Sequence, residues 1–346
     1  MVGPTLRYAE GPGRYVEHGL VLRLSGTRAV LYGTGTPLPT FNRLYDVRTG
    51  KIDALGPNSN PWSYGAVDAF GNYLAYSTDK SGRTEVRRRD QSTGKDVLVA
   101  SAPKIKKVAV YGNLVAWLTD CREGVWPCAQ TVAYRTVGAT GVLGPVKSFA
   151  TRGTISIDLS ATHLALDTLL SRREVRIVTL GANAVRVVGT LPAKASSGWI
   201  PPLAIGDRDV VPVHFDLDGN RIGWLDANQT ARVAAVDGPA TRARYLGNGV
   251  IPASFPSTGK FSASLPFSAN PSKCTVTFKK GTTAVRIMPC VVRNGDVQLS
   301  WDARTGSGAK VAKGKYSWTL TASTPAGRVL WYSGTASPIT AAVTVS

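Results

Sequence analysis

The stretch Val67-Asp68-Ala69-Phe70-Gly71-Asn72-Tyr73-Leu74-Ala75-Tyr76 is one copy of a unit that recurs along the chain. It aligns without a gap on Val108-Ala109-Val110-Tyr111-Gly112-Asn113-Leu114-Val115-Ala116-Trp117. The same register recurs at residues 157–166 and 215–224, and more weakly at 22–31. Successive copies begin 45, 41, 49 and 58 residues apart, which indicates five copies of one structural repeat.

Each copy is predicted to be a set of short strands. Apolar residues alternate on both sides of Gly71-Asn72, a pair that is typical of a tight hairpin turn. A third strand with a second turn follows, seen as Asp-x-x-Thr-Gly-Lys at residues 46–51 and 90–95. A fourth strand, such as Asp96–Val99, completes a unit of about 40 to 50 residues, the size of a β-propeller blade.

The pattern Gly-Asn-hydrophobic-Ala-aromatic, followed by Asp-x-x-Thr-Gly-Lys, resembles the repeat of TolB-type β-propellers. The resemblance implies a propeller whose repeats mostly serve packing, in a family that includes periplasmic scaffolds and the gating domains of some peptidases. Propellers of this type more often have six or seven blades than five. Residues 1–16 are therefore expected either to close the ring or to be the remnant of a lost blade, and we favour a missing N-terminal portion.

The C-terminal part is predicted to be a separate module. Residues 246–272 are rich in Pro, Ser and Gly and are expected to form a linker. Beyond them, strand-like segments with turn signals between them are typical of a small β-sandwich. These segments are Cys274–Phe278, Ala284–Met288, Val297–Trp301, Lys315–Thr321, Arg328–Tyr332 and Ile339–Val345. We therefore expect an all-β chain with a β-propeller or propeller fragment over residues 1–255 and an immunoglobulin-like β-sandwich over residues 262–346.

Residues 297–322 resemble the immunoglobulin-like domain of flagellar hook-capping (FlgD-type) proteins. They read Trp-Asp-Ala-Arg at 301–304, then a glycine turn, then Gly-Lys-Tyr-Ser-Trp at 314–318. Ala303 stands where that family usually has glycine, and Lys313 where it has Asp or Asn. The resemblance implies a structural or adhesive module without catalysis.

Within this module, three residues carry specific expectations. Trp301 and Trp318 are expected to be core aromatic residues on facing strands. Gly314 is expected to allow a close approach of the backbone before the strand that contains Tyr316.

The four cysteines form two local pairs, Cys121 with Cys128 and Cys274 with Cys290. Two short-range disulfides are expected, with four reduced thiols as the alternative, and the spacing of neither pair suits zinc. Disulfides persist in oxidising compartments, so we expect an extracellular or cell-surface protein. No signal peptide is recognised at the start, which indicates a mature form or an incomplete reading frame. No apolar run is long enough to cross a membrane.

Two local features are candidate sites. Asp216-Leu217-Asp218-Gly219-Asn220 has the alternating oxygen donors of a calcium loop, which makes Asp216 and Asp218 a weak metal candidate. The segment aligns with the repeat turn at residues 68–72, so a hairpin is the favoured interpretation. The predicted loop closed by Cys121 and Cys128 presents Trp126, which is either a ligand contact or, as we favour, a packed residue. No cofactor other than calcium is expected.

The chain is strongly basic, with 41 Lys and Arg against 22 Asp and Glu and a formal net charge of +19. Basic clusters at residues 87–89, 104–107 and 172–173 suit an anionic cell-wall polymer, or they keep blade edges soluble. Nucleic acid is an unlikely partner, because no helix-turn-helix or stacking module is recognised. Residues 266–346 hold ten Lys and Arg against two Asp, so the C-terminal module is the more basic of the two.

The expected function is a non-enzymatic secreted or cell-surface binding or scaffold protein. The propeller would recognise a protein or cell-wall polymer, and the sandwich would act as a spacer or dock onto an anionic envelope surface. The alternative is a hydrolase or lyase with its site in the central propeller channel. The two differ in one respect: an enzyme should present carboxylates or His side chains clustered at one mouth of the channel, whereas a scaffold should have an apolar, plugged channel.

Overall fold

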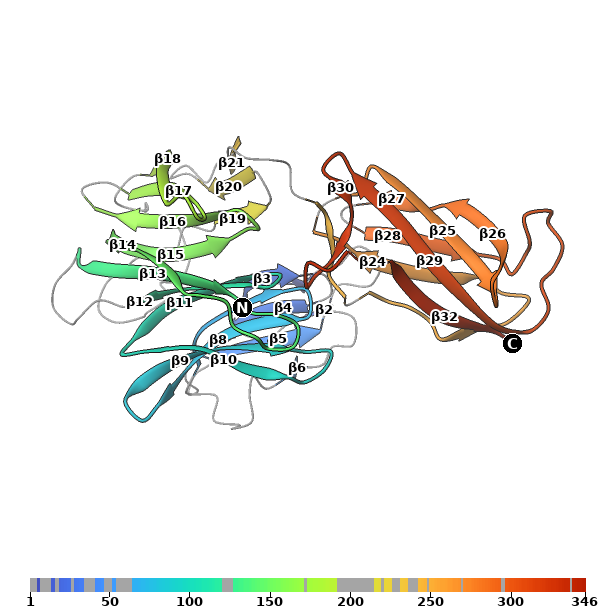
Figure 1. The fold of residues 1–346 in the computed structure, drawn as a ribbon, viewed down its shortest axis with the longest axis horizontal. Coiled ribbons are helices and arrows are strands. Elements are labelled where there is room, and N and C mark those ends of the chain that lie inside the picture. The colour runs from blue at the N-terminus through green and yellow to red at the C-terminus, as the bar shows by residue number, and fades with distance from the viewer. Residues whose placement is uncertain are drawn as a thin grey trace.

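The computed structural model consists of strands and turns in two parts, with the N-terminal sheets on one side and the C-terminal sandwich on the other (Figure 1). It describes residues 64–119, 127–170, 173–191, 242–247, 249–268, 270–293, 296–336 and 338–346. Within residues 1–63 and 215–235 it describes the strands. The predicted fold class, all-β with propeller-type sheets followed by a sandwich, is confirmed.

Four antiparallel sheets of four strands follow one another along the chain, as expected for propeller blades. The first comprises β3 (Gly19–Ser25), β4 (Arg28–Gly33), β5 (Phe41–Asp46) and β6 (Ile52–Asp53). The second comprises β7 (Tyr64–Phe70), β8 (Tyr73–Lys80), β9 (Arg83–Asp90) and β10 (Asp96–Ala102). The third comprises β11 (Ile105–Tyr111), β12 (Leu114–Thr119), β13 (Ala129–Thr136) and β14 (Lys147–Arg152). The fourth comprises β15 (Thr154–Leu159), β16 (His163–Leu169), β17 (Arg173–Thr179) and β18 (Ala184–Leu191).

Two further sheets are described in the N-terminal part. A fifth blade contains β19 (Phe215–Asp218), β20 (Arg221–Leu225) and β21 (Ala231–Ala235). Near the start of the chain, β1 (Thr5–Leu6) pairs with β2 (Arg14–Tyr15) as a separate two-stranded sheet. Of the two alternatives for residues 1–16, the closing strand is therefore not found among the described ladders.

The repeat turns have the predicted hairpin geometry. Phe70 pairs with Tyr73 across Gly71-Asn72, and Tyr111 pairs with Leu114 across Gly112-Asn113. The second turn of the repeat also forms, because the Asp90 carboxylate accepts a hydrogen bond from the backbone N–H of Ser92 at 2.8 Å. This side-chain acceptor stabilises the bend that joins β9 to β10.

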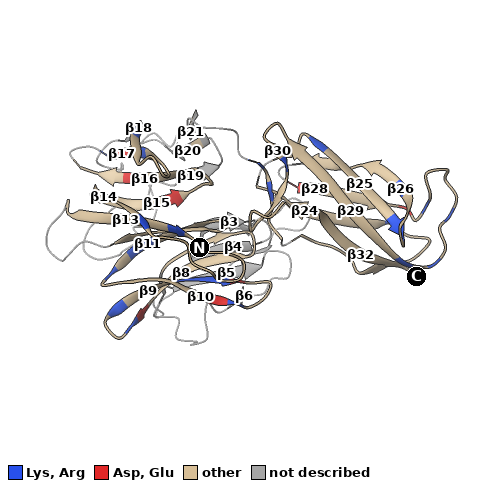
Figure 2. Ribbon diagram, viewed as in Figure 1, with Lys and Arg blue, Asp and Glu red and all other residues tan. Residues whose placement is uncertain are grey.

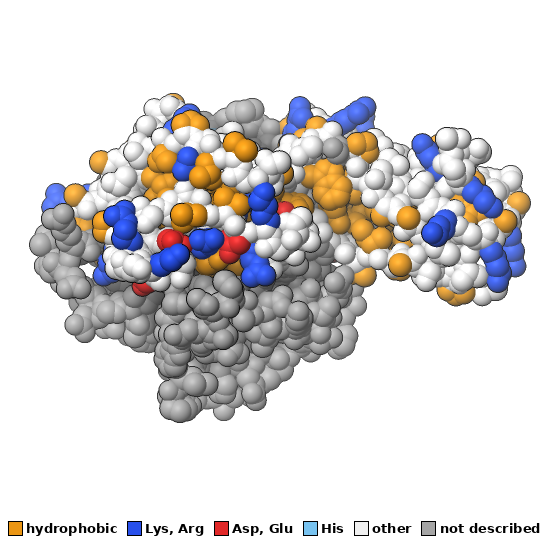
Figure 3. Space-filling view, turned by 60° about the horizontal axis from the view of Figure 1, so that its bottom comes forward, with side chains coloured by type: hydrophobic (Ala, Val, Ile, Leu, Met, Phe, Trp, Pro, Cys, Tyr) orange, Lys and Arg blue, Asp and Glu red, His pale blue; other side chains and the backbone are white. Residues whose placement is uncertain are grey.

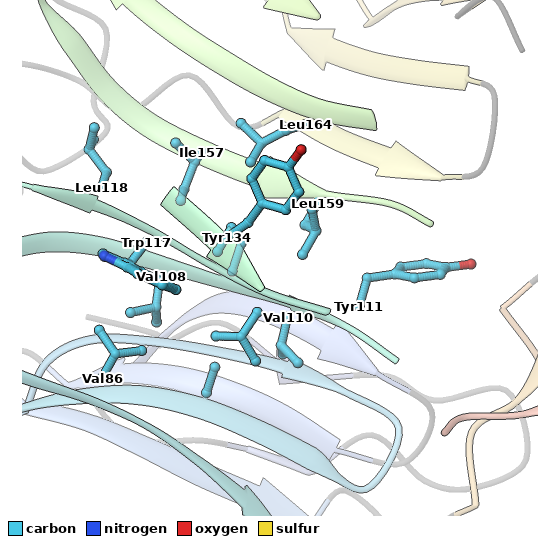
Figure 4. Packing of buried hydrophobic residues seen from close by; sticks show 14 of the residues in the cluster. Val86, Val108, Val110, Tyr111, Trp117, Leu118, Tyr134, Ile157, Leu159 and Leu164 are labelled. Atoms are coloured by element: carbon cyan, nitrogen blue, oxygen red, sulfur yellow. The ribbon is translucent and has the colours of Figure 1, made fainter. Parts of the chain in front are cut away.

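The blades pack face to face through a common apolar core. The second strand of a blade is buried on both faces, so β8 begins with five consecutive buried residues rather than an alternation. Figure 4 shows Val86 of the second blade, Val108 and Trp117 of the third, and Leu164 of the fourth between the stacked sheets. Burial of this apolar surface, at about 25 cal/mol per Å², is the main force that holds neighbouring blades together.

The C-terminal part is a two-layer sandwich. The larger sheet has the order β23 (Ser254–Phe255), β32 (Ile339–Val345), β29 (Gly314–Thr324), β25 (Lys273–Lys280) and β26 (Thr283–Pro289), with β30 (Gly327–Arg328) on β29. The smaller sheet has the order β24 (Phe261–Pro266), β28 (Asp296–Trp301) and β27 (Val291–Arg293). A short parallel pair joins β22 (Arg244–Tyr245) to β31 (Leu330–Trp331). The predicted strand Arg328–Tyr332 is thus split between β30 and β31.

Residues 246–272, predicted as a linker and the entry to the sandwich, contain a strand that was not among the predicted strand segments. Within that segment, β24 pairs along its whole length with β28, from Phe261↔Trp301 to Pro266↔Asp296. Its buried residues Phe261, Ala263 and Leu265 alternate with Ser side chains, as in a half-buried strand. The flanking prolines hid this alternation, because proline is tolerated at strand ends.

The sandwich core contains the two predicted tryptophans. Trp301 on the smaller sheet and Trp318 on the larger sheet are both fully buried. Phe278 stacks on Trp301 with ring centroids 4.4 Å apart, and Tyr316 meets the same indole edge-on. These aromatic contacts join the two layers at their centre.

The predicted role of Gly314 is wrong. A Cβ atom at this position would meet no atom within 4 Å, so no close approach requires glycine there. Its φ of +136° is the reason instead, because L side chains rarely adopt that conformation. Ala303 also has a positive φ, of +56°.

One predicted disulfide is formed between Cys274 and Cys290, with Cα atoms 5.5 Å apart. Cys274 lies on β25, and Cys290 lies between β26 and β27, where the chain crosses from one sheet to the other. The bridge therefore ties this crossover to the larger sheet. Cys128 is also disulfide-bonded, and its predicted partner Cys121 lies outside the described residues.

Candidate functional site at the junction of propeller and sandwich

The sandwich docks on the repeat turns of the second and third blades. The side-chain amide of Asn72 donates a hydrogen bond to the backbone carbonyl of Gly247 at 3.0 Å. A Cβ atom on Gly71 would lie 2.5 Å from the carbonyl oxygen of Leu246, and one on Gly112 would lie 2.8 Å from that of Tyr332. Glycine at both turns thus allows the backbone of the C-terminal part to approach closely. Figure 3 shows hydrophobic side chains gathered between the two parts.

Tyr332, which follows β31, is the central side chain of this junction. Its ring meets that of Tyr73 in an edge-on geometry, with centroids 4.7 Å apart. Its hydroxyl donates to the carboxylate of Asp90 at 3.3 Å and lies 3.2 Å from the hydroxyl of Ser92. The second turn of the repeat therefore contacts the sandwich as well.

Two buried arginines flank these tyrosines. The guanidinium of Arg244 lies 5.0 Å from the ring centroid of Tyr111, which points toward the sandwich (Figure 4), and donates to the carbonyl of Tyr332. The guanidinium of Arg88 lies 4.1 Å from the ring centroid of Tyr73 and donates to two backbone carbonyls of the third blade. Burial lowers the pKa of both arginines, although Arg remains protonated in proteins. Both contacts are cation–π interactions. That of Arg244 joins elements distant in sequence, whereas that of Arg88 joins the neighbouring strands β9 and β8.

The Tyr73 hydroxyl is buried and has no hydrogen-bond partner among the described residues. Burial raises the pKa of Tyr73 to about 12, and the nearby Arg88 opposes that rise. Burial also raises the pKa of Tyr332. These phenols keep their protons at neutral pH, so the cluster is suited to holding two parts together and not to proton transfer.

The carboxylates on the inner strands are used by the backbone. Asp68 on β7 accepts a hydrogen bond from the backbone N–H of Val110 on β11 at 2.7 Å, which joins two blades. Asp158, at the aligned position of β15, accepts from the N–H of Leu159 at 2.8 Å. Asp216 is the aligned residue of β19. At this repeat position, Asp68 therefore joins two blades and Asp158 bonds the backbone of its own strand, while the third blade has Ala109 there.

Other titratable groups of the fourth blade are also engaged in the fold. The buried carboxylate of Asp167 forms a two-point ion pair with Arg173, at 2.6 and 3.0 Å. Burial raises the pKa of Asp167, and the Arg173 guanidinium opposes that rise. The His163 ring nitrogen lies 2.9 Å from the hydroxyl of Thr162 in the turn before β16. His18 and His214 lie outside the described residues.

The predicted basic clusters are largely absorbed by the propeller. Arg87 pairs with Glu85 and Asp96, and Arg88 is 2% exposed. Arg173 pairs with Asp167, while Arg172 lies outside the described residues. In the cluster at 104–107, Ile105 is buried, both following lysines are half-buried on β11, and only Lys104 is exposed. The run of three arginines at residues 87–89 did not by itself indicate that Arg88 would be buried against the next blade.

The remaining predicted sites are only partly described. Asp216 and Asp218 lie in β19, which pairs with β20 up to Asp218↔Arg221, as in the favoured hairpin. Their side chains and Trp126 lie outside the described residues. In the part of the chain that the structure describes, no group of three His, Cys, Asp or Glu side chains is arranged to hold a metal ion. No described helix is long and apolar enough to cross a membrane.

No protein-family model and no curated protein matches the chain. Among solved structures it is similar to TolB from Acinetobacter baumannii, with 15% identity and a TM-score of 0.38, over 62% of this chain and 52% of TolB. The β-propeller domain of the Trilobed protease from Pyrococcus furiosus is 10% identical, with a TM-score of 0.35, over 90% of this chain and 95% of that domain. PorZ, a surface component of the type-IX secretion system of Porphyromonas gingivalis, is 14% identical, with a TM-score of 0.33, over 99% of this chain and 47% of PorZ. The chain spans about half the length of TolB and of PorZ.

Proposed function

We propose that the chain is a non-enzymatic binding or scaffold protein in which the sandwich is held in a fixed position on one face of the propeller. The observation that carries this proposal is the structural use of the inner-strand carboxylates. Asp68 and Asp158 are buried and accept backbone hydrogen bonds, whereas a catalytic carboxylate must be accessible to a substrate. The alternative, a hydrolase or lyase in the channel, needs an accessible group of this kind.

The junction supports the scaffold part of the proposal. It combines a side-chain hydrogen bond from Asn72, the edge-on pair Tyr73 and Tyr332, and the buried cation Arg244. Contacts of this kind limit the motion of one part relative to the other. A ligand bound by the propeller is then held at a fixed distance from whatever the sandwich binds.

The remaining assignments belong to the same proposal. We assign the sandwich to the FlgD-type immunoglobulin-like class, with the propeller over residues 1–255 and the sandwich over residues 262–346. Within the predicted propeller range, residues 243–255 belong to the packing of the sandwich, because Ala243, Tyr245 and Phe255 lie in its core, and the junction is therefore described with these residues on the sandwich side. An extracellular or cell-surface location is favoured by the disulfide between Cys274 and Cys290. The partner class is a protein or an anionic cell-wall polymer.

The test is to incubate the purified chain with intact cell-envelope material and to measure two quantities over time. One is the amount of chain retained, and the other is the release of soluble sugar or peptide fragments. A binding protein gives saturable retention without release. Fragments that accumulate with time, and in proportion to the amount of chain, would establish the hydrolase or lyase instead.

A further inference from the structure

The end of the sandwich that lies away from the propeller carries an unusual concentration of positive charge. Three connections and the C-terminus meet there, because β24 starts opposite the end of β28, β29 starts opposite the end of β32, and β25 turns into β26. We call this the distal end. Its cationic residues are Lys260, Lys279, Lys280, Arg286, Arg304, Lys310, Lys313 and Lys315.

These charges have little internal compensation. Asp302 is the one acidic residue in the same loops, and its carboxylate lies 3.9 Å from Arg304 in an exposed contact. Lys280, Lys310, Lys313 and Lys315 are exposed. An exposed ion pair of this kind is weak. Because eight cationic residues face this single carboxylate, the electrostatic potential at the distal end remains positive. Figure 2 shows blue segments at this end with little red beside them.

The distal end differs in this respect from the basic clusters of the propeller. There, Arg87 is paired with two carboxylates, and Arg173 lies in a buried ion pair. At the distal end, five of the six lysines are exposed, Lys279 is half-buried, and Lys280 makes a cation–π contact with Tyr316 at 5.6 Å. The sandwich therefore docks on the propeller through one end and presents free cations at the other.

The residue types indicate which anion fits. Most of these cations are lysines, and a lysine ammonium is a point charge on a flexible stem that imposes no fixed ligand geometry. Among the described residues of this end, Trp301 and Tyr316 are buried in the core, so their rings are not available for stacking on bases. Figure 3 shows the basic side chains set apart from one another around the end, where a flexible chain reaches more of them than a rigid surface does.

We propose that the distal end of the sandwich binds a flexible linear polymer with phosphate groups along its backbone. This inference rests on the proposed binding function. It assigns the contact with the anionic ligand to the distal end of the sandwich. Binding releases counterions from the polymer, so the affinity depends steeply on salt. The propeller face remains free for a second, specific ligand.

The experiment uses the full chain and long-chain inorganic polyphosphate as the probe, with affinity measured over a series of salt concentrations. The test variant removes five distal charges: Lys279→Gln, Lys280→Gln, Lys310→Gln, Lys313→Gln and Lys315→Gln. The matched control removes five exposed cations elsewhere: Lys80→Gln, Lys104→Gln, Lys147→Gln, Lys273→Gln and Arg328→Gln. Both variants carry the same net charge, and their melting temperatures show whether they fold.

The test variant should lose affinity on the order of 100-fold. The slope of its log affinity against log salt concentration should become shallower by roughly 0.7 for each phosphate that the variant no longer neutralises. The control should stay within about threefold of the unaltered chain. Equal weakening in both variants would mean that only net charge matters and would overturn the proposal. Tighter binding of duplex DNA or of anionic phospholipid vesicles, at equal phosphate concentration, would overturn it as well.

The two proposals fail in different ways. If the distal variant no longer binds polyphosphate but the chain is still retained on envelope material, the propeller supplies a separate contact and both proposals stand. If the unaltered chain binds polyphosphate yet cleaves envelope material, the proposed non-enzymatic function fails while the distal site stands. If both variants bind polyphosphate as the unaltered chain does, the distal site fails alone.

Discussion

The side-chain amide of Asn72 donates a hydrogen bond to the backbone carbonyl of Gly247, 175 residues further along the chain, at 3.0 Å. A turn residue that each repeat needs only for its local hairpin thus also carries a contact between the propeller and the sandwich. The third blade has the aligned residue Asn113 in an equivalent turn. Comparing variants of Asn72 and Asn113 therefore distinguishes the role of the asparagine in the local turn from its role at the junction.

Replacing Asn72 with Ala should loosen the junction. The hydrogen bond that is removed is worth about 1 kcal/mol, and its removal leaves the carbonyl of Gly247 without this donor. Hydrogen exchange in a peptide that covers residues 243–247 should therefore become faster. Asn113→Ala is the control, because it changes the aligned turn residue of the third blade. Equal acceleration in both variants would show that only the turn, and not the contact with Gly247, is responsible.

Two buried tyrosines of β8 should respond in opposite ways to removal of the hydroxyl. Tyr76 donates to the carboxylate of Asp96 at 2.5 Å, so Tyr76→Phe should lower the free energy of unfolding by about 1.5–3 kcal/mol. The hydroxyl of Tyr73 is buried without a hydrogen-bond partner among the described residues. Tyr73→Phe should therefore raise the free energy of unfolding by about 1 kcal/mol. Denaturant unfolding at pH 7 measures both values. A destabilised Tyr73→Phe protein would contradict the assignment of an unpaired hydroxyl.

Tyr73 should also make stability depend on pH in the alkaline range. Burial raises its pKa to about 12 in the folded state, against 10.0 for an unperturbed tyrosine. The unfolded chain therefore loses this proton first as the pH rises. The associated stabilisation is fully present below pH 10 and is lost between about pH 10 and 12, by at most about 2.7 kcal/mol. Unfolding at pH 9 and pH 11 should show a smaller decrease in Tyr73→Phe than in the unaltered chain, and an equal decrease would exclude Tyr73 as the source.

Asp68 should behave as a packing residue. Asp68→Ala leaves the N–H of Val110 without its acceptor and should lower the free energy of unfolding by about 1–3 kcal/mol. Ala109 occupies the aligned position of the third blade, so alanine is compatible with the backbone there. Asp302→Ala, which removes an exposed carboxylate, should change stability by less than about 1 kcal/mol. If Asp68→Ala were as stable as the unaltered chain, the carboxylate would be free for another role.

The repeat made most of the fold predictable, because the apolar alternation recurs in five copies and the Gly-Asn turn recurs in three of them. Strand β32 begins and ends at the predicted residues, Ile339 and Val345. Prolines around Phe261–Pro266 concealed a strand whose partner, β28, lies more than thirty residues away. The junction was not predicted at all, since Gly71 and Asn72 form a complete local turn by themselves. The inward use of Arg88 was missed for a similar reason: the neighbouring blade that covers it is set by tertiary structure.

The last prediction concerns two residues with left-handed backbone conformations. Ser81 is exposed in the turn between β8 and β9 with a φ of +51°, and Ala303 is buried with a φ of +56°. Glycine relieves about 1 kcal/mol of strain at either position, offset in part by its greater freedom in the unfolded chain. Ala303→Gly also removes a buried methyl group worth about 0.8 kcal/mol. Ser81→Gly should therefore raise the melting temperature more than Ala303→Gly does, with Lys80→Gly as a destabilising control in the same hairpin. A larger rise in melting temperature for Ala303→Gly than for Ser81→Gly would contradict this prediction. It would mean that the packing of the Ala303 methyl group does not stabilise the left-handed conformation of that residue.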